Sequence, residues 1–410
     1  MTSLLILADD LTGAADCANA CRRLGMPASA LLNPLAGMGC LSNAGGNMQA
    51  VALDANSRNL RPALAADLHR RILRRHLTPS TPLYKKVDST LRGNIGAEIA
   101  ATIRLAGMAI LAPAFPATGR RTVAGQQQVH GTAVSETEIW RNIGLSGTAD
   151  IVQMMRAEGL QAVGIPLSCV RQSTASLREQ FLASARAGTQ VLVCDAEAAS
   201  DLQAIARASS RLPAPHFWAG SAGLMEYVAA TLIQAGKASD IALPAATGRV
   251  LTVVGSMSDI SANQVRQLND QRPVQLVSAS SDTLAAGEAH PDWLTLRDSL
   301  TAALRSGDVM IAVCGDSRLN PAAGSLLCLA LGRLIAPHAA GLAAIIATGG
   351  ETARAVLDAV GITALRLAGE VEEGVPISLG TGARPLAVIT KAGAFGDTQT
   401  LVRCYDALRH

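Results

Sequence analysis

Residues 84–96 read YKKVDSTLRGNIG, in which a short strand-like run ends in a charged loop and a helix begins. Two lysines, an aspartate, two hydroxyl side chains and an arginine lie between Lys85 and Gly93. The GNIG segment marks the start of the helix. Because only 16% of the whole chain is charged, this concentration of charge after a strand indicates a site for a small anion.

The composition favours a large, well-packed protein with two domains. A chain of 410 residues exceeds the size at which one ordinary hydrophobic core suffices. Hydrophobic residues make up 49% of it, which argues against disorder, and aromatic residues only 2%, so the core must consist of Ala, Leu, Val and Ile. Scarce aromatics and a net charge of +3 spread along the chain disfavour nucleic-acid partners.

No segment is expected to cross a membrane. The best apolar candidate, 326–347, is interrupted by an arginine, a proline and a histidine, whereas a spanning helix needs about 20 uninterrupted apolar residues. The first apolar run, 4–8, is too short for a signal peptide and leads directly into two aspartates. We therefore expect a cytoplasmic protein.

Eight cysteines without a CxxC motif are typical of reduced core thiols. Cys17 and Cys21 are four residues apart on a predicted helix and could share a metal ion, but no histidine pair lies near them. We interpret both as buried small residues and predict no metal site built from protein side chains.

Apolar strands alternate with polar turns and helices along the whole chain. The pattern predicts a helix that follows the first strand up to residue 24, a helix at 61–76, and strands at 4–8, 48–54, 82–87, 109–112, 191–194, 250–254, 309–313, 342–347 and 386–390. This alternation indicates an α/β fold with mostly parallel or mixed sheets flanked by helices. The segment 235–249, AGKASDIALPAATGR, is small and polar and predicts a boundary between two domains, 1–235 and 248–410.

Two aspartates follow the first strand directly, in ADDLTGAAD at 8–16. Ligands of parallel α/β sheets bind outside the carboxyl ends of the strands, where both carboxylates are expected. Asp10 could bind a substrate hydroxyl or accept a proton. It could equally be a plain helix N-cap, a role worth about 1 kcal/mol.

Strand alternation places Lys86 and Asp88 on one face of their strand, so both can contact one ligand. Lysine supplies a cation for a carboxylate, aspartate accepts hydroxyl hydrogens and Ser89 adds a donor, a set that suits a polyhydroxylated acid. Arg58, just after another strand, offers a guanidinium fork to a carboxylate. The alternatives are a surface salt-bridge cluster for the first set and a solvated loop arginine for Arg58.

Two further stretches, 113–121 and 218–223, are predicted to be loops that follow strands. The first ends in Gly119, Arg120 and Arg121, and the second reads WAGSAG. Both could line a binding cleft, but their spacing assigns no role to them.

Three turns rich in glycine or serine follow strands of the second predicted domain: GSMS at 255–258, TGGET at 348–352 and KAGAFGD at 391–397. Small residues let the backbone approach a phosphate, and the first N–H groups of a helix attract anions. Neither GxGxxG nor a Walker A motif is present at these turns, and glycine can also serve turn geometry alone. Three such turns in one domain favour a nucleotide site. With the anion site of the first domain they indicate group transfer across a cleft between the domains.

Eight motifs together resemble the four-carbon acid sugar kinases, a family long classified as a domain of unknown function. They are ADDLTGAAD (8–16), YKKVDSTLRGNIGAE (84–98), APAFPATGR (112–120), GSAGL (220–224), GSMS (255–258), TGGET (348–352), GEVEEGVP (369–376) and KAGAFG (391–396). The resemblance implies ATP-dependent phosphorylation of the terminal hydroxyl of a four-carbon sugar acid, with Mg²⁺ on the ATP phosphates. It implies that the first domain holds the acid and the second domain the nucleotide, with the active site in the cleft between them.

The resemblance also implies roles for individual residues. The acid would be bound by Asp10, Arg58, Lys86, Val87, Asp88 and Ser89, and the nucleotide by Ser258, Thr348, Gly349, Gly350, Glu351 and Gly393. Asp10 or Asp88 would orient the hydroxyl and take its proton, and we favour Asp10. Asn56 stands where relatives often have aspartate. Within the family, KKVDSTLRGNIG resembles the branch that acts on D-threonate, and the Cys-Ser-Thr-Phe-Asp-Ser-Thr form typical of 3-oxo-tetronate kinases is absent.

Other readings stay open beside this one. The same chemistry could act on D-erythronate or 3-oxo-tetronate. The chain could also form a homo-oligomer, because apolar helices such as 326–335 could be core or interface. An NAD-dependent dehydrogenase would need GxGxxG after a strand and an acidic residue about 20 positions later, and the chain has no such arrangement. A non-enzymatic sugar-acid sensor would need an output module, for which the remaining sequence leaves no room. The expected partners are therefore the sugar acid and ATP.

Overall fold

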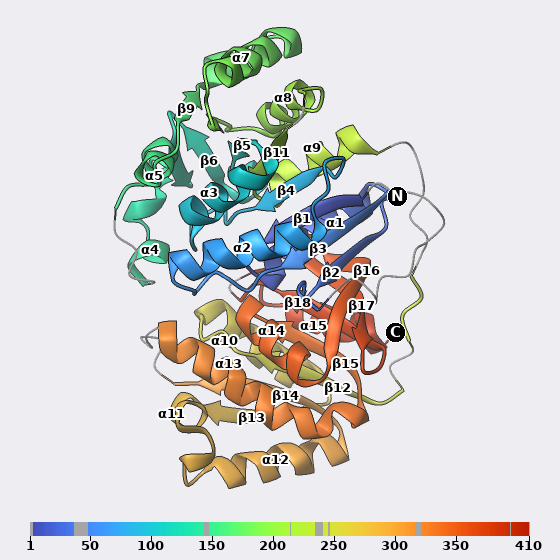
Figure 1. Cartoon of the computed structure of the whole chain (residues 1–410). Coiled ribbons are helices and arrows are strands. Elements are labelled where there is room, and N and C mark those ends of the chain that lie inside the picture. The colour runs from blue at the N-terminus through green and yellow to red at the C-terminus, as the bar shows by residue number, and fades with distance from the viewer. Residues whose placement is uncertain are drawn as a thin grey trace. The chain divides into compact units, whose positions relative to one another are not determined.

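The computed structural model describes residues 3–36, 48–142, 147–213, 215–233, 241–244, 247–315, 321–393 and 395–409. The chain divides into two compact units, Met1–Ser239 and Asp240–His410 (Figure 1). The sequence predicts a boundary within 235–249, of which residues 235–240, 245 and 246 lie outside the described residues. Each unit is a sheet flanked by helices, which confirms the α/β prediction.

The paired strands of the first unit's large sheet are all parallel. They lie in the order β2-β3-β1-β4-β11-β5-β10-β9. Their bounds are β1 Ser3–Ala8, β2 Ala28–Leu31, β3 Gln49–Asp54, β4 Leu83–Lys86, β5 Met108–Ala112, β9 Ala162–Ile165, β10 Val191–Cys194 and β11 His216–Gly220. From β1 the chain runs to one side for β2 and β3 and to the other side for β4. Such a reversal beside β1 is where open α/β sheets bind ligands, at the carboxyl ends of the strands.

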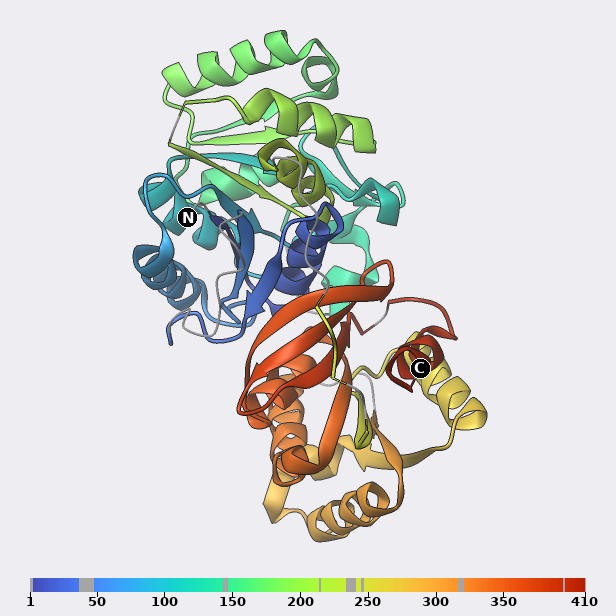
Figure 2. The same ribbon diagram turned by 90° about the vertical axis from the view of Figure 1, so that its right-hand side faces the viewer.

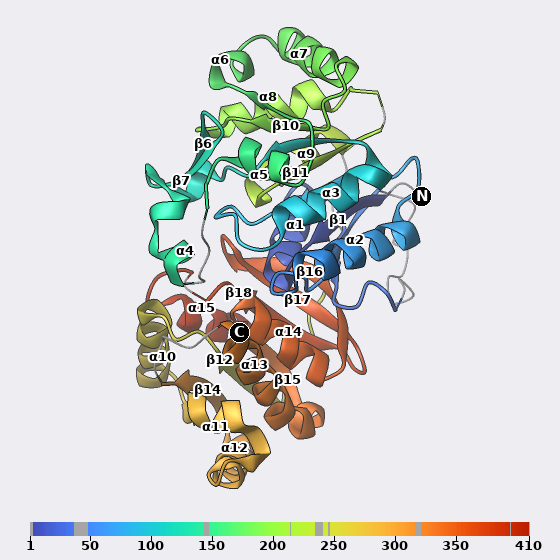
Figure 3. The ribbon, with the colours of Figure 1, turned by 60° about the vertical axis from the view of Figure 1, so that its left-hand side comes forward.

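The helices of the first unit form two rows. α2 packs against α3, as Figure 3 shows, and α3 also contacts α5, whereas α1, α9 and α8 pack against one another in turn. Crossovers between parallel strands are right-handed, so connections that run in opposite directions along the sheet place their helices on opposite faces. The bounds are α1 Leu11–Arg23, α2 Pro62–His76, α3 Ile95–Ala106, α4 Glu138–Asn142, α5 Ile151–Ala157, α6 Leu167–Val170, α7 Thr174–Arg186, α8 Ala199–Ser209 and α9 Ala222–Leu232.

A small antiparallel sheet shows that part of one loop prediction is wrong. The sequence predicts a loop over 113–121, but Arg120 and Arg121 begin a strand. The sheet consists of β6 Arg120–Val123, β7 Gln126–Val129 and β8 Thr132–Ala133, with the short helices η1 Pro116–Thr118 before it and η2 Val134–Glu136 after it. β6 reads RRTV and β7 reads QQQV, so neither has the apolar run by which the other strands are detected.

The predicted loop at 218–223 is wrong in the same way. Residues 218–220 are the last three residues of β11, and α9 begins at Ala222 with Ser221 as its N-cap. The loop is thus reduced to a single residue. Glycine and alanine in this stretch lowered its apparent strand propensity, although Phe217 and Trp218 in β11 are almost completely buried.

The sheet of the second unit is mixed. Its strands lie in the order β13-β14-β12-β15-β18-β17-β16, of which the first five are parallel while β17 pairs antiparallel with both of its neighbours. The bounds are β12 Arg249–Val254, β13 Val274–Ser280, β14 Asp308–Cys314, β15 Leu342–Thr348, β16 Ile362–Glu372, β17 Val375–Gly382 and β18 Leu386–Lys391. The three small-residue turns follow β12, β15 and β18, which are neighbours in this sheet.

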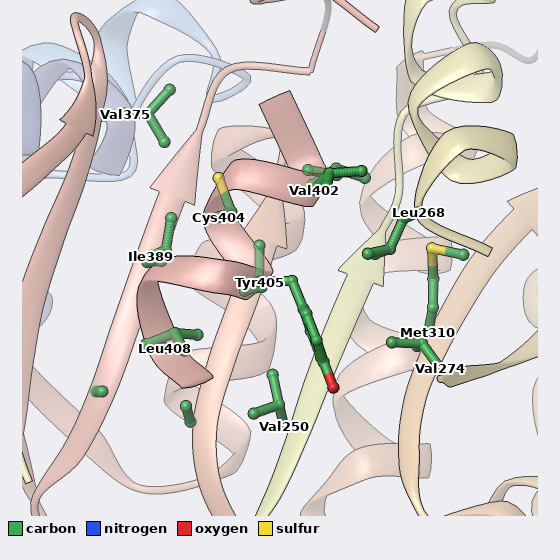
Figure 4. Close-up of a cluster of buried hydrophobic side chains, with 14 of the residues drawn as sticks. Val250, Leu268, Val274, Met310, Val375, Ile389, Val402, Cys404, Tyr405 and Leu408 are labelled. Carbon is green, nitrogen blue, oxygen red and sulfur yellow. The ribbon is translucent and has the colours of Figure 1, made fainter. Parts of the chain in front are cut away.

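Helices pack on the second unit's sheet in two groups. α13 packs against α11 and α14, and α10 packs against α15, which Figure 2 shows beside it at the C-terminal end of the chain. The bounds are α10 Asp259–Gln271, α11 Ser281–Ala286, η3 Gly287–Ala289, α12 Trp293–Ser306, α13 Pro321–Ile335, η4 Ala336–Gly341, α14 Gly350–Ala359 and α15 Thr400–Arg409. Side chains of α10 and α15 close over β12, β14 and β18 in a core that is almost free of aromatic residues (Figure 4). This confirms a core of mainly aliphatic residues.

The apolar segment Gly324–Gly341 passes a test of length and hydropathy for a membrane-spanning helix. The α-helix within it, α13, ends at Ile335 and has 15 residues, fewer than the roughly 20 needed to span a bilayer. α13 packs against α14 through one side, while Leu326 and Leu329 on it are 50% and 52% exposed. The helix therefore has both a core face and an exposed apolar face.

Cys17 and Cys21 are completely buried in α1, which confirms the interpretation of both as small core residues. Burial raises the pKa of Cys17 to about 12, and burial also raises the pKa of Cys21. Both thiols are therefore protonated and unreactive near neutral pH.

Candidate functional site

The polar residues of the first unit gather at the carboxyl ends of three neighbouring strands. Asp9 and Asp10 follow β1, Arg58 lies in the loop after β3, and Lys86 is the last residue of β4. β1 lies between β3 and β4 in parallel register, so these side chains reach the same edge of the sheet. The structure thus brings together residues that the sequence places up to about 80 positions apart.

Arg58 is the centre of this cluster. Its Nε and Nη2 donate to the two oxygens of Asp9 at 2.7 and 3.0 Å, and its Nη1 donates to Asp10 Oδ2 at 2.8 Å. Its Nη2 also lies 3.7 Å from Asp88 Oδ2. The side chain is only 16% exposed, so Arg58 is not a solvated loop arginine.

The charges of the cluster stabilise one another. Burial by itself would raise the pKa of Asp9, but Arg58 and then Lys85 lower it to about 2. Burial opposes the charge of Arg58 as well, yet Asp10, Asp9 and Asp88 raise its pKa well above the usual value. Since most of the donors of Arg58 already meet protein carboxylates, its fork is occupied before any ligand binds.

Asp10 has two partners. Its Oδ1 accepts from the backbone N–H of Gly13 at 2.9 Å, so it caps α1, and its Oδ2 accepts from Arg58. The capping interpretation is therefore correct but incomplete, because the carboxylate also belongs to the charged cluster. A Cβ atom at Gly13 would lie 2.7 Å from Asp10 Oδ1 and 2.9 Å from Lys86 Nζ, which explains the glycine at this position.

Strand alternation in β4 follows the prediction. The Lys86 and Tyr84 side chains lie on the face of the strand toward α1, where both interact electrostatically with Cys17. Lys85 lies on the other face and pairs with Glu98 of α3 at 2.9 Å. Burial alone would lower the pKa of Lys86, but the carboxylates of Asp10 and Asp88 raise it, so the ammonium stays charged near neutral pH. Lys86 is 6% exposed and therefore does not belong to a surface salt-bridge cluster.

Asp88 organises the loop after β4. Its Oδ1 accepts from the backbone N–H of Thr90 at 2.8 Å and from the Thr90 hydroxyl, and its Oδ2 accepts from Arg92 Nη2 at 2.6 Å. Burial acts against its charge, but Arg92 and Arg58 hold the pKa of Asp88 well below its usual range. Asp88 is thus a firmly ionised acceptor whose oxygens already have several donors.

Side chains from elsewhere fix the backbone of the same loop. Gln127 Nε2 donates to Ser89 O at 2.7 Å and Trp140 Nε1 donates to Thr90 O at 2.8 Å. The backbone N–H of Val87 donates to Gly220 O at 2.9 Å, and the Val87 side chain is buried. Ser89 remains half-buried, so its hydroxyl can meet a ligand.

Behind the cluster lies a buried polar network that sequence reasoning missed. Glu98 accepts from Ser57 Oγ at 2.6 Å, pairs with Lys85 and lies 3.4 Å from His69 Nε2. Asn94 Nδ2 donates to the carbonyl oxygens of Ser57 and Leu60 at 3.1 and 2.9 Å. The network therefore holds the Arg58 loop against α3. The sequence signal that could have revealed it was Glu98, an acidic residue among the small and apolar residues of the first two turns of α3.

His69 makes the stability of this network depend on pH. Burial lowers the pKa of His69 to about 4 from a usual value of 6.5, with Glu98 opposing the shift and Lys85 adding to it. Between pH 6.5 and 4 the unfolded chain binds a proton that the folded chain does not, so stability falls as pH falls through this window. The loss of folding free energy approaches about 3 kcal/mol near pH 4.

We expect His69→Gln to reduce the fall in the thermal midpoint between pH 8 and 4.5, because glutamine does not titrate in this range. The same fall of the midpoint with pH in the variant as in the wild type would contradict this role of His69.

In the second unit, the three turns lie beside one another at the ends of β12, β15 and β18. Ser258 is the N-cap of α10 and accepts from Ser261 N at 3.2 Å, and Ser261 Oγ donates to Gly393 O at 2.8 Å. The backbone N–H of Gly349 donates to Lys391 O at 2.9 Å. Hydrogen bonds therefore join all three turns into one surface.

The tight approach of these turns requires small residues. Gly349 has φ +89°, a conformation that favours glycine, and it is followed by the first residue of α14, Gly350. A Cβ at Gly393 would lie 2.8 Å from both Cβ and Oγ of Ser256. Glu351 lies in the first turn of α14 and accepts from Ser325 Oγ at 3.2 Å.

Two buried polar groups lie under the turns. Lys391 Nζ donates to the carbonyl oxygens of Ala392 and Gly393, each at 3.0 Å, and burial lowers its pKa to about 8 against the opposing effect of Cys404 and Glu372. The buried Thr348 Oγ1 has no hydrogen-bond partner among the described residues. Backbone N–H groups at a helix start and an unsatisfied hydroxyl suit a phosphate ligand.

Comparisons with known proteins assign sugar binding to the first unit and nucleotide binding to the second. Residues 4–228 match the family model for a sugar-binding N-terminal domain, and residues 251–401 match that for a nucleotide-binding C-terminal domain. A crystal structure from Salmonella typhimurium LT2, described as a putative tRNA synthase, has the same fold. It superimposes with a TM-score of 0.80 at 21% identity, covering 98% of this chain and 99% of the other.

Curated relatives match along the whole chain. A D-threonate kinase of Cupriavidus necator is 43% identical over 99% of this chain and 98% of its own length. A D-threonate kinase of Bordetella bronchiseptica is 32% identical over 98% and 97%. A 3-oxo-tetronate kinase of Pseudomonas savastanoi is 28% identical over 95% and 94%.

Fold, site and comparisons define a two-domain protein with a sugar-binding and a nucleotide-binding domain. The chain belongs to the four-carbon acid sugar kinase family.

Proposed function

We propose that this chain transfers the γ-phosphoryl group of ATP to the terminal (4-) hydroxyl of a four-carbon sugar acid, D-threonate. The observation that carries the proposal is the buried cluster of Asp10, Arg58, Lys86 and Asp88 beside β1, in a chain with full-length similarity to D-threonate kinases. We also propose a cytoplasmic location, because that compartment supplies ATP.

Each residue of the acid site has a distinct proposed part. Lys86 supplies a buried positive charge, Asp88 accepts hydroxyl hydrogens, and Ser89 with the backbone from Val87 onward adds donors and acceptors. The guanidinium of Arg58 is already bound to protein carboxylates. Arg58 therefore acts on the ligand mainly by holding Asp10 in position. A site that hydrogen-bonds each hydroxyl discriminates strongly against an epimer, because the mismatched epimer leaves buried groups unpaired.

Asp10 is the proposed general base. As the 4-hydroxyl oxygen forms its bond to the γ-phosphorus, the bond from that phosphorus to the ADP oxygen breaks and the hydroxyl proton passes to Asp10. Asp88 is a poorer proton acceptor, because Arg92, Arg58 and Thr90 stabilise its ionised form. Asp88 is better suited to orienting the acid.

The proposed nucleotide site consists of Ser258, Gly393 and the turn Thr348–Glu351. Lys391 holds the carbonyl oxygens of Ala392 and Gly393 in its own turn, and N–H groups at the start of α14 are proposed to face the phosphates. Among the described residues, no group of three or more His, Cys, Asp or Glu side chains could hold a metal ion. Mg²⁺ is therefore proposed to enter with the phosphates of ATP, whose charge it neutralises.

A substitution at Gly393 tests the nucleotide site. We expect Gly393→Ala to raise the KM for ATP about 10-fold or more, because the added methyl group pushes against Ser256 and separates two of the turns. The KM for the acid should change less than 3-fold. Gly307→Ala is the matched control, since a Cβ there would meet nothing within 4 Å. An unchanged KM for ATP in Gly393→Ala would argue against this turn as part of the site.

The proposed reaction can be tested directly. The purified chain is incubated with ATP, Mg²⁺ and D-threonate, D-erythronate or 3-oxo-tetronate, and ADP release is followed for each acid. We expect the highest kcat/KM with D-threonate and a 4-phosphate ester in the ³¹P NMR spectrum. A higher kcat/KM for another acid would replace the substrate, and no ADP above background with any acid would refute the kinase proposal.

A further inference from the structure

Two arginines on which the charge of Asp88 acts, Arg92 and Arg120, have donors that the described structure does not use. Arg92 lies in the loop after β4, and Arg120 is the first residue of β6. Arg92 donates to Asp88 Oδ2 through Nη2 alone. The Nε atoms of both arginines are buried, and neither has a hydrogen-bond partner among the described residues. A buried N–H group without an acceptor is unfavourable, so each arginine can take a further acceptor at Nε, although the Arg92 side chain as a whole is 40% exposed.

Arg92, Arg120 and Asp88 lie close enough for their charges to interact. Burial lowers the pKa of Arg120, Asp88 raises it and Arg92 lowers it further. No salt bridge joins Arg120 to any residue in the described ranges, unlike Arg58 and Arg92. Among the described residues Lys86 makes no salt bridge either, but nearby carboxylates raise the pKa of Lys86, whereas the pKa of Arg120 stays lowered.

The backbone of Arg120 is held in place from three sides. Arg120 and Phe115 exchange backbone hydrogen bonds of 3.1 and 2.8 Å. The turn after β6 is tied to the end of β10, since Asp195 accepts from Ala124 N and Gly125 N at 2.8 and 2.9 Å. Through Gln127, the same small sheet also holds Ser89 O. Arg120 thus sits on a rigid support that is coupled to the predicted acid-binding loop.

Two arginines of the second unit also have a buried Nε but differ from Arg120 in their partners. Arg354 pairs with Asp358, and Arg384 donates through Nη1 to Ala340 O at 2.7 Å. Among the described residues, it is in the first unit that such arginines accompany a partly exposed hydroxyl loop and several buried charges.

The net charge of the cluster is positive and would be balanced by one anion. Arg58, Lys86, Arg92 and Arg120 are cations, and Asp9, Asp10 and Asp88 are carboxylates, so one positive charge is left over. A planar guanidinium binds a carboxylate through two parallel hydrogen bonds, and the buried setting strengthens them. Arg58 cannot present such a fork, because Asp9 already occupies it.

We propose that Arg120, assisted by Arg92, binds the carboxylate of the sugar acid, while Arg58 positions Asp9 and Asp10. The inference rests on the proposed sugar-acid kinase function and deepens it. The acid is then held at its carboxylate end by Arg120 and at its hydroxyls by Asp88 and Ser89. The shared chemistry is that of an oxyanion, so the transferring phosphoryl group is the competing ligand that the experiment must distinguish.

The test compares a charged and a neutral ligand without nucleotide. Dissociation constants of D-threonate and of its neutral amide, D-threonamide, are measured by calorimetry for the wild type, Arg120→Ala and Arg120→Lys, together with KM values for the acid and ATP. Arg121→Ala is the matched control, because Arg121 is its exposed neighbour on β6. Thermal midpoints verify that each variant is folded.

We expect Arg120→Ala to weaken D-threonate binding about 30- to 100-fold. Binding of D-threonamide and the KM for ATP should change less than 3-fold. Arg120→Lys should recover part of the loss, since it keeps the charge but not the fork, and Arg121→Ala should behave like the wild type. Equal weakening of both ligands, unchanged binding of D-threonate, or a rise in the KM for ATP alone would overturn the inference. If the wild type releases no ADP with any acid, the proposed function itself fails, whichever result Arg120 gives.

Discussion

Asp10→Asn is expected to lower kcat about 100- to 1,000-fold while the KM for the acid changes little. General-base catalysis typically contributes a factor of this size, and an amide cannot take the hydroxyl proton. Asparagine is as good an N-cap as aspartate, so α1 should keep its cap at Gly13. Arg58 loses its ion pair with Asp10 but keeps both hydrogen bonds to Asp9, so the variant should fold with some loss of stability. The loss of activity should appear in kcat measured at saturating acid and ATP.

Asp88→Asn is the natural comparison. Asp88 holds Thr90 and Arg92 and is firmly ionised, so its replacement should raise the KM for the acid more than it lowers kcat. A near-wild-type kcat in Asp10→Asn would show that Asp10 is not the base. If Asp88→Asn alone abolished turnover at saturating acid, the roles of the two aspartates would have to be exchanged.

Glu98→Ala is expected to destabilise the protein by about 3–5 kcal/mol. The substitution leaves the ammonium of Lys85, which is completely buried, with only the carbonyl oxygen of Lys86 as a partner. Breaking a buried ion pair from one side costs this much, because an uncompensated charge remains inside. Ser57 and the Arg58 loop also lose an anchor. Chemical denaturation, followed by circular dichroism, measures the change in unfolding free energy.

A double substitution separates the stranded charge from the loss of packing. Lys85→Met combined with Glu98→Leu removes both charges and should recover a large part of the stability lost in Glu98→Ala. Glu179→Ala is the control, since its pair with Arg186 is exposed and should contribute less than about 1 kcal/mol. If Glu98→Ala cost no more than Glu179→Ala, the network would not be a determinant of stability.

Much of the fold could be predicted from local patterns. The predicted strands at 4–8, 191–194, 342–347 and 386–390 agree with β1, β10, β15 and β18 to within one residue at each end. Apolar runs bounded by polar turns carry this information, because a strand buried on both faces must be apolar along its length. β6 and β7 carry no such run and were missed. They are polar because they form a small separate sheet rather than part of the large one.

The predicted acid site and the observed cluster share their main residues. Asp10, Arg58, Lys86 and Asp88 follow strands whose carboxyl ends are neighbours in a parallel sheet, and this rule is readable from sequence. Asp9 was noticed only as a neighbour of Asp10, and its two hydrogen bonds to Arg58 were not foreseen. Pairing between individual side chains depends on rotamers and burial, which the order of residues along the chain does not encode.

The α/β class, the strands that carry the site and the small-residue turns can be read from the order of the residues, because each of them leaves a local pattern in composition or spacing. Which charges meet depends on how the chain folds. Arg58 and Asp9 are 49 positions apart, yet Asp9 occupies the Arg58 fork, and Arg120 comes from a separate small sheet to lie near Asp88. These ion pairs matter for stability because they are largely buried, and a charge without a partner in the interior is unfavourable by several kcal/mol.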